Sequence, residues 1–259
     1  MVSVRAKTPM RRRLASIHPP RWICATVIFV TSASILSFAA AADAQLKPDN
    51  SHQHPKPVVL APGYSRLEFI PPVVGSYLLP PIGVAADGQV IDSQGRARRL
   101  HDFVGDKVTV LSFIYTSCND INGCPLATFV LKGVQQSVLA DKQLAGRVRL
   151  LSLSFDPDHD TPEVVKAYGR HFKTPGFDWQ FLTTASTDEL NPILDAYDQA
   201  VIRDYDASGN YLGTLSHILR VVLVDPKRRI RNIYSTSFLH ADTVANDIRT
   251  LLIQNPRNI

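Results

Sequence analysis

Two hydrophobic periods alternate along residues 82–259 and predict strands that alternate with helices. Residues 107–115 (KVTVLSFIY) form a nearly continuous run of β-branched and aromatic side chains, which is typical of a strand buried in the middle of a sheet. Residues 147–155 (RVRLLSLSF) predict a second strand. Between the two strands, apolar side chains recur with the spacing of one helix face, at Leu126, Val130, Val134 and Val138. This order of elements predicts a strand–helix–strand unit.

The alternation continues to the end of the chain. Helices are predicted over residues 160–171, 187–197 and 239–252, and a short strand over residues 179–182. Two more strands, 218–224 and 230–234, flank an Asp-Pro turn and predict a hairpin, and residues 90–92 predict a further short strand. Elements in this order predict one α/β domain over residues 82–259, a thioredoxin-like sandwich with a central mixed sheet flanked by helices.

Residues 45–81 have a different composition, because they hold 8 of the 18 prolines of the chain. Proline lacks a backbone N–H and cannot continue ladders or helices, so this stretch is predicted to be an extended tether. His52 and His54 lie within it and are a candidate metal-binding pair; the alternative is two solvated side chains.

Residues 1–44 predict an export signal. Basic residues lead into an uncharged apolar run over residues 23–42, and the run ends at Ala42-Asp43-Ala44, a site of the kind that signal peptidase cuts. Cleavage there leaves Gln45 as the first residue of a periplasmic protein. The alternative is a retained signal anchor in the inner membrane that faces the periplasm, since 20 apolar residues suffice to span a bilayer.

The charge of the chain excludes one class of function. Residues 1–44 contain six basic residues and one acidic residue, which account for the whole net charge of +5; the remaining residues carry 22 of each sign. A domain without net positive charge has no long-range attraction for a phosphate backbone. A nucleic-acid-binding function is therefore not expected.

The candidate chemistry lies with two cysteines. Cys118 follows the first buried strand, and Cys124 begins the next helix, with Pro125 suited to the first helical turn. Open α/β sheets place their ligand sites at this edge, and a helix N-terminus favours a thiolate. A disulfide that closes so short a loop stabilises a domain little, so a redox pair or a pair of soft metal ligands is favoured over a structural bridge.

Two polar clusters accompany these elements. Asp156, Asp158, His159 and Asp160 follow the second strand and form either a turn with a helix cap or a support for the cysteine site. The basic residues of segment 227–231 form either a solvated face or a docking surface for an acidic partner.

Three segments together resemble the Sco/SenC family of copper-binding proteins. They are FIYTSCNDINGCPLA (113–127), SFDPDHDTPEVVKAYG (154–169) and LSHILRVVLVDPKRRIRNIY (215–234). The resemblance implies an exported thioredoxin fold that binds one copper ion and helps to assemble the dinuclear copper site of cytochrome c oxidase. By position, it implies Cys118 and Cys124 as thiolate ligands and His217 as the imidazole ligand. The family usually has three residues between its cysteines, whereas this chain has five.

The donor types agree with copper. Two thiolates and one imidazole suit Cu(I) and also hold Cu(II) in a tetragonal site. Structural zinc sites more often use four protein ligands, and the only other cysteine, Cys24, lies in the predicted signal.

Two functions are expected from these residues. The first is a copper metallochaperone whose partner is a protein client, with cytochrome c oxidase subunit II as the implied one. The second is a periplasmic thiol–disulfide oxidoreductase in which Cys118 and Cys124 are the redox-active pair and keep a client's cysteines reduced. His217 separates the two, because dithiol exchange does not require it. A monomer is expected in both cases.

Overall fold

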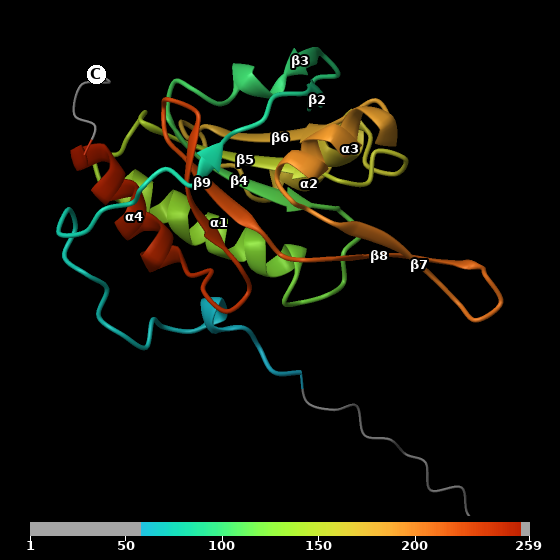
Figure 1. Cartoon of the computed structure of the whole chain (residues 1–259), viewed down its shortest axis with the longest axis horizontal. Helices are drawn as coiled ribbons and strands as arrows, with labels where there is room; N and C mark the ends of the chain where they lie inside the picture. The colour runs from blue at the N-terminus through green and yellow to red at the C-terminus, as the bar shows by residue number, and fades with distance from the viewer. Residues whose placement is uncertain (1–57, 255–259) are drawn as a thin grey trace, which may run out of the picture. The chain divides into compact units, whose positions relative to one another are not determined.

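The protein is represented by a computed structural model that describes residues 58–254. Within them an eight-stranded mixed sheet has the strand order β1-β10-β9-β4-β5-β6-β2-β3 (Figure 1). Its centre consists of the parallel strands β4 (Val108–Ile114), β5 (Val148–Ser154) and β6 (Trp179–Thr183). On one side of this centre lie β9 (Val221–Val224), β10 (Arg229–Tyr234) and β1 (Gly83–Val84); on the other lie β2 (Gln89–Asp92) and β3 (Ala97–Arg99). Every residue of β4 and β5 is buried, as expected for the centre of such a sheet.

Helices cover both faces of the sheet. The helix α1 (Cys124–Ala140) packs beside α4 (Ala241–Gln254), and its Thr128 bonds Tyr168 of α2 (Pro162–Arg170). On the opposite face lies α3 (Thr187–Ala196), where Tyr197 at the helix end packs on Phe113 of β4. The predicted thioredoxin-like sandwich with a central mixed sheet is confirmed.

The predicted helices begin where their capping residues indicate. Thr161 accepts a hydrogen bond from the backbone N–H of Val164, and Pro162 occupies the first turn of α2. Ser186 caps α3 in the same way by bonding the N–H of Glu189. No helix within residues 58–254 combines the length and the apolar character needed to cross a bilayer.

A second, two-stranded sheet was not predicted. It is the hairpin of β7 (Val201–Tyr205) and β8 (Tyr211–His217), which projects from the domain (Figure 1). The predicted strand 218–224 is therefore wrong at its start, because β8 ends at His217 and β9 begins only at Val221. Most hairpin residues are exposed on both faces, so they lack the apolar alternation from which a half-buried strand is predicted.

The proline-rich stretch differs from an extended tether in its described part, residues 58–81. Apart from the single 3₁₀ turn η1 (Pro62–Tyr64), this part has no regular structure, in agreement with its prolines. It nevertheless packs against the domain. The hydroxyl of Tyr77 donates to Asp247 of α4 at 2.5 Å, and the side chain of Asn246 donates to Pro72 C=O at 3.0 Å. Part-buried hydrogen bonds of this kind hold residues 58–81 to the domain, which proline content alone does not predict.

Residues 1–57 and 255–259 lie outside the described part of the chain. The predicted signal or anchor over residues 1–44 falls there, and so do His52 and His54.

The basic segment 227–231 is largely a structural network rather than a free surface. Asp225 is fully buried and accepts hydrogen bonds from the side chains of Arg229 and Arg231, both at 2.8 Å. Arg231 also bonds Leu79 C=O, and Arg228 bonds Val104 C=O. Burial alone would raise the pKa of Asp225, but the hydrogen bonds from the two arginines outweigh it and lower the pKa below its ordinary value of 3.8.

This network predicts a pH-dependent contribution to stability. Because the folded-state pKa of Asp225 is depressed, its contribution is complete above about pH 4 and is lost as the pH falls through the folded-state pKa. We expect Asp225→Asn to lower the free energy of unfolding by about 3 kcal/mol at neutral pH. Urea unfolding of both proteins should show this difference shrinking below about pH 4. Asp102→Asn, which removes an exposed partner of Arg98, is the control and should change stability little. A difference that does not change with pH would contradict this assignment.

Candidate metal centre

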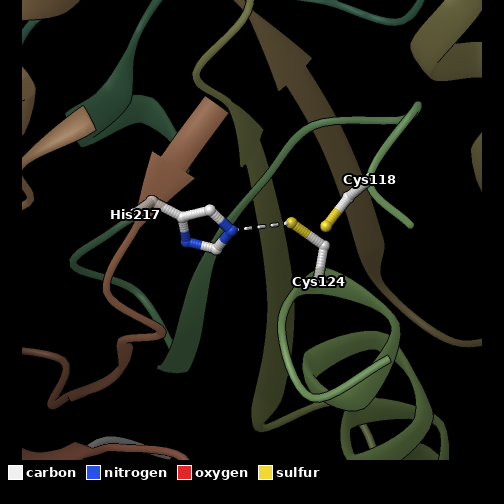
Figure 2. A group of neighbouring side chains, drawn as sticks. All are labelled: Cys118, Cys124 and His217. Atoms are coloured by element: carbon white, nitrogen blue, oxygen red, sulfur yellow. Dashed lines mark hydrogen bonds between the residues drawn. The ribbon is translucent and has the colours of Figure 1, made fainter. Parts of the chain in front are cut away.

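Three side chains from distant parts of the sequence meet at one end of the sheet. The Sγ atoms of Cys118 and Cys124 and a ring nitrogen of His217 all lie within 4.8 Å of one another (Figure 2). Cys124 Sγ and His217 Nε2 are 3.5 Å apart, although 93 residues separate them in sequence. The structure thus brings all three sequence-predicted site residues together.

The two cysteines are placed by the junction of β4 and α1. Cys124 is the first residue of α1 and is 1% exposed, and its Sγ accepts a hydrogen bond from the backbone N–H of Tyr115 at 3.4 Å. Cys118 lies in the connecting loop, is half-buried, and is a free thiol like Cys124. One sulfur is therefore fixed inside the protein while the other is accessible from outside.

His217 is placed by the β7–β8 hairpin, as the last residue of β8. Its ring packs against Phe155, with ring centroids 4.8 Å apart, and against the edge of Tyr115 at 6.0 Å. Its Nδ1 is buried and has no hydrogen-bond partner among the described residues. Aromatic packing, rather than a hydrogen bond at Nδ1, directs Nε2 toward the sulfurs.

A buried carboxylate supports the start of the cysteine loop. Asp160 is 0% exposed and accepts hydrogen bonds from the backbone N–H of Thr116 at 2.9 Å and from the hydroxyl of Ser154 at 2.6 Å. The hydroxyl of Thr116 and the ring of His159 complete its partners. The segment 156–160 therefore does more than begin a helix, since Asp160 joins the end of β5 to the loop that carries Cys118.

The pKa values of the two thiols are shifted in opposite directions. The hydrogen bond from Cys124 to the Cys118 thiolate lowers the pKa of Cys118 to about 4, against the opposing effect of burial and with a further contribution from His217. The same sulfur–sulfur interaction, together with burial, raises the pKa of Cys124. At neutral pH the pair therefore holds one thiolate, at the more accessible Cys118.

This donor set fits a soft or borderline metal ion. Bonds of about 2.0–2.3 Å to nitrogen and sulfur, as at zinc, let one ion join donors about 4.5 Å apart. The three donors lie within 4.8 Å of one another, so a small approach of the side chains is enough for one ion to join them. Two sulfurs and one imidazole suit copper in both of its common oxidation states.

The family model for SCO1/SenC matches residues 83–253, which is well over half of the chain. The chain belongs to the SCO1/SenC family. The resemblance stated from the sequence is thereby confirmed, and the matched residues include both cysteines and His217.

Solved structures of this family have the same fold. Apo Sco1 of Thermus thermophilus is 28% identical over 70% of this chain and 97% of its own, with a TM-score of 0.56. Arabidopsis thaliana ScoI, solved with copper bound, is 22% identical over 66% of this chain and 99% of its own, with a TM-score of 0.56. BsSco, a member of the Sco family of cytochrome c oxidase assembly proteins in which a disulfide switch is identified, is 22% identical over 67% of this chain and 97% of its own, with a TM-score of 0.53.

Several supporting residues of this SCO1/SenC chain were not predicted individually. Phe155 and Tyr115 are the last residues of the two predicted central strands, and the sequence around them is typical of ordinary core residues. No local pattern indicates that a histidine packs on them. Asn122 in the cysteine loop reads as a turn residue, yet its side chain bonds residues 59 and 61. Only for Asp160 was there a signal, in the polar cluster that follows the second strand.

The opposite pKa shifts predict how the thiols react in the reduced, metal-free protein. Iodoacetamide should modify Cys118 far faster than the buried Cys124. Because Cys118 is already a thiolate, its rate should stay nearly constant between about pH 6 and 8, whereas an ordinary thiol gains about tenfold per pH unit. Peptide mass spectrometry measures both rates. Cys124→Ala removes the hydrogen bond from the Cys124 thiol and is expected to restore a pH-dependent rate at Cys118; equal reactivity of the two thiols in the parent would contradict the assignment.

Proposed function

We propose that this protein binds one copper ion through Cys118, Cys124 and His217 and delivers it, as a metallochaperone, to the copper site of cytochrome c oxidase. The observation that carries the proposal is the convergence of two sulfurs and one imidazole nitrogen within 4.8 Å. Copper is the substrate of this activity, and the client is a protein, with subunit II of the oxidase as the proposed one.

The relatives support the choice of metal and client. Arabidopsis thaliana ScoI holds copper, and BsSco belongs to a family of cytochrome c oxidase assembly proteins. Family membership does not by itself identify the metal ligands of this chain. The donor types and their spacing here agree with copper.

The unequal exposure of the two cysteines suits delivery of a metal. Cys118 is half-buried and carries the thiolate, so a ligand from a client can approach the metal on this side. Cys124 and His217 are held by packing and by backbone contacts, so they keep the ion in place until exchange occurs. Stepwise replacement of ligands avoids release of free copper into solvent.

A second candidate function is thiol–disulfide exchange with a client. It is favoured by the low pKa of Cys118 and by the proximity of the Cys124 sulfur, which can resolve a mixed disulfide. His217 is not needed for this chemistry. Its direction toward the two sulfurs therefore favours copper as the main activity and leaves exchange as an accompanying one.

We further propose that residues 1–44 direct export to the periplasm and that residues 45–81 join this signal to the thioredoxin-like domain. The basic start, the apolar run and the Ala-x-Ala site support this division.

Copper binding is tested by titrating the reduced protein with Cu(II). We expect about one ion per chain and sulfur-to-copper charge-transfer absorption. His217→Ala should weaken Cu(II) binding clearly and leave the fold intact, whereas His171→Ala, which changes an exposed histidine on another part of the domain, should bind as the parent does. The oxidised protein with a Cys118–Cys124 bridge should take up no copper, because the bridge consumes both sulfur ligands. Parent-like binding by His217→Ala would overturn the ligand assignment, and full binding by the oxidised protein would place the metal elsewhere.

Export is tested by N-terminal sequencing and fractionation of the native protein. Cleavage after Ala44 predicts a first residue near Gln45 and recovery in the soluble periplasm. An intact Met1 with quantitative recovery in membranes would instead establish the anchored form.

A further inference from the structure

The loop between the two cysteines, residues 119–123, is held by the chain that precedes the family domain. The side-chain amide of Asn122 accepts a hydrogen bond from the backbone N–H of Ala61 and donates one to Val59 C=O, both at 2.8 Å. The side-chain amide thus bonds an N–H and a carbonyl that lie two residues apart on one chain segment, as the backbone of a neighbouring β-strand would. One side chain therefore joins the cysteine loop to residues 59–64, which we name the N-terminal clamp.

A second contact attaches the clamp to the same loop. The hydroxyl of Tyr64 donates to Ile121 C=O at 2.6 Å, and the ring of Tyr64 packs on Phe129 of α1 with centroids 4.9 Å apart. The clamp thus contacts two successive loop residues and also the first turns of the helix that carries Cys124.

The clamp is itself fixed to the domain. Ala61 is 6% exposed, and Gly63 lies so close to its neighbours that an added Cβ would be 2.3 Å from Leu239 C=O. No side chain larger than a hydrogen fits there without movement of the backbone. The loop is therefore attached to a firm support rather than to a loose strand of chain.

The clamp lies outside the part of the chain that matches the family model. The SCO1/SenC match begins at residue 83, after the clamp, and five residues separate the two cysteines. A loop of this length can move its cysteines apart, and an external attachment at Ile121 and Asn122 removes part of that freedom.

We propose that the N-terminal clamp positions Cys118 relative to Cys124, with Asn122 as the positioning residue. Holding the loop raises the effective concentration of one sulfur near the other. Copper binding and disulfide formation both require the two sulfurs together, so the clamp favours both. For copper the inference rests on the proposed function; for the disulfide it does not.

The experiment measures the dithiol–disulfide equilibrium of the metal-free full chain, with Cys24→Ala so that only this pair reacts. Oxidised glutathione takes two electrons and two protons from Cys118 and Cys124, which gives the protein disulfide and two molecules of reduced glutathione. Asn122→Ala removes both amide bonds and should lower this equilibrium constant about tenfold. Tyr64→Phe, which loses only the hydroxyl bond, should lower it about threefold.

Two matched variants separate positioning from general stability. Asn246→Ala and Tyr77→Phe remove similar hydrogen bonds between the N-terminal stretch and α4, away from the cysteines. Neither should change the equilibrium constant. An unchanged constant in Asn122→Ala would overturn the inference, and so would equal shifts in Asn122→Ala and Asn246→Ala.

Copper titration of the same variants separates this inference from the proposed function. If the parent binds copper, Asn122→Ala should bind it about tenfold more weakly, the lower end of losses seen when a support of metal ligands is removed. If the parent binds none while the dithiol constant still falls in Asn122→Ala, the clamp is supported and the copper function is overturned.

Discussion

The close approach of the Cys124 sulfur to the His217 ring is the interaction on which the site depends. Cys124 is buried at the first turn of α1, where its sulfur contacts the Tyr115 N–H and His217 Nε2. Because the Cys124 thiol is buried, its position is fixed. The other two side chains of the site, Cys118 and His217, therefore have to be positioned relative to it. The central strand β4 fixes its position, because the chain passes from β4 through a single loop into α1.

The remaining parts of the site hold their positions by different means. His217 comes from an exposed hairpin and is directed by its packing on Phe155, whereas the start of the cysteine loop is fixed by hydrogen bonds to the buried Asp160. Packing orients the His217 ring without using its nitrogens as hydrogen-bond partners. Hydrogen bonds fix the backbone of the cysteine loop without filling space around it. This division leaves Cys118, on the loop side, as the more accessible of the two cysteines.

The proline-rich stretch has an unexpected relation to this chemistry. Its described part runs along α4 and α1 and reaches the cysteine loop through Asn122 and Tyr64. Prolines keep this stretch out of the sheet, which leaves its backbone N–H and C=O groups free to bond side chains of the domain. A segment that resembles a linker in composition therefore becomes a structural part of the cysteine site.

The sequence by itself determined the fold class and the two cysteines. Buried strands and amphipathic helices have local patterns, and residues 107–115 and 124–138 carry them clearly; Cys118 and Cys124 are placed by the same local strand-to-helix junction. His217 was found only through resemblance, since its hairpin is exposed and has no core pattern. Tertiary structure alone decided that Phe155 orients this histidine, that Asp160 supports the loop and that Asn122 binds residues 59 and 61. These contacts join residues between 44 and 63 positions apart, and the packing of the whole sheet, not any local preference, brings them together.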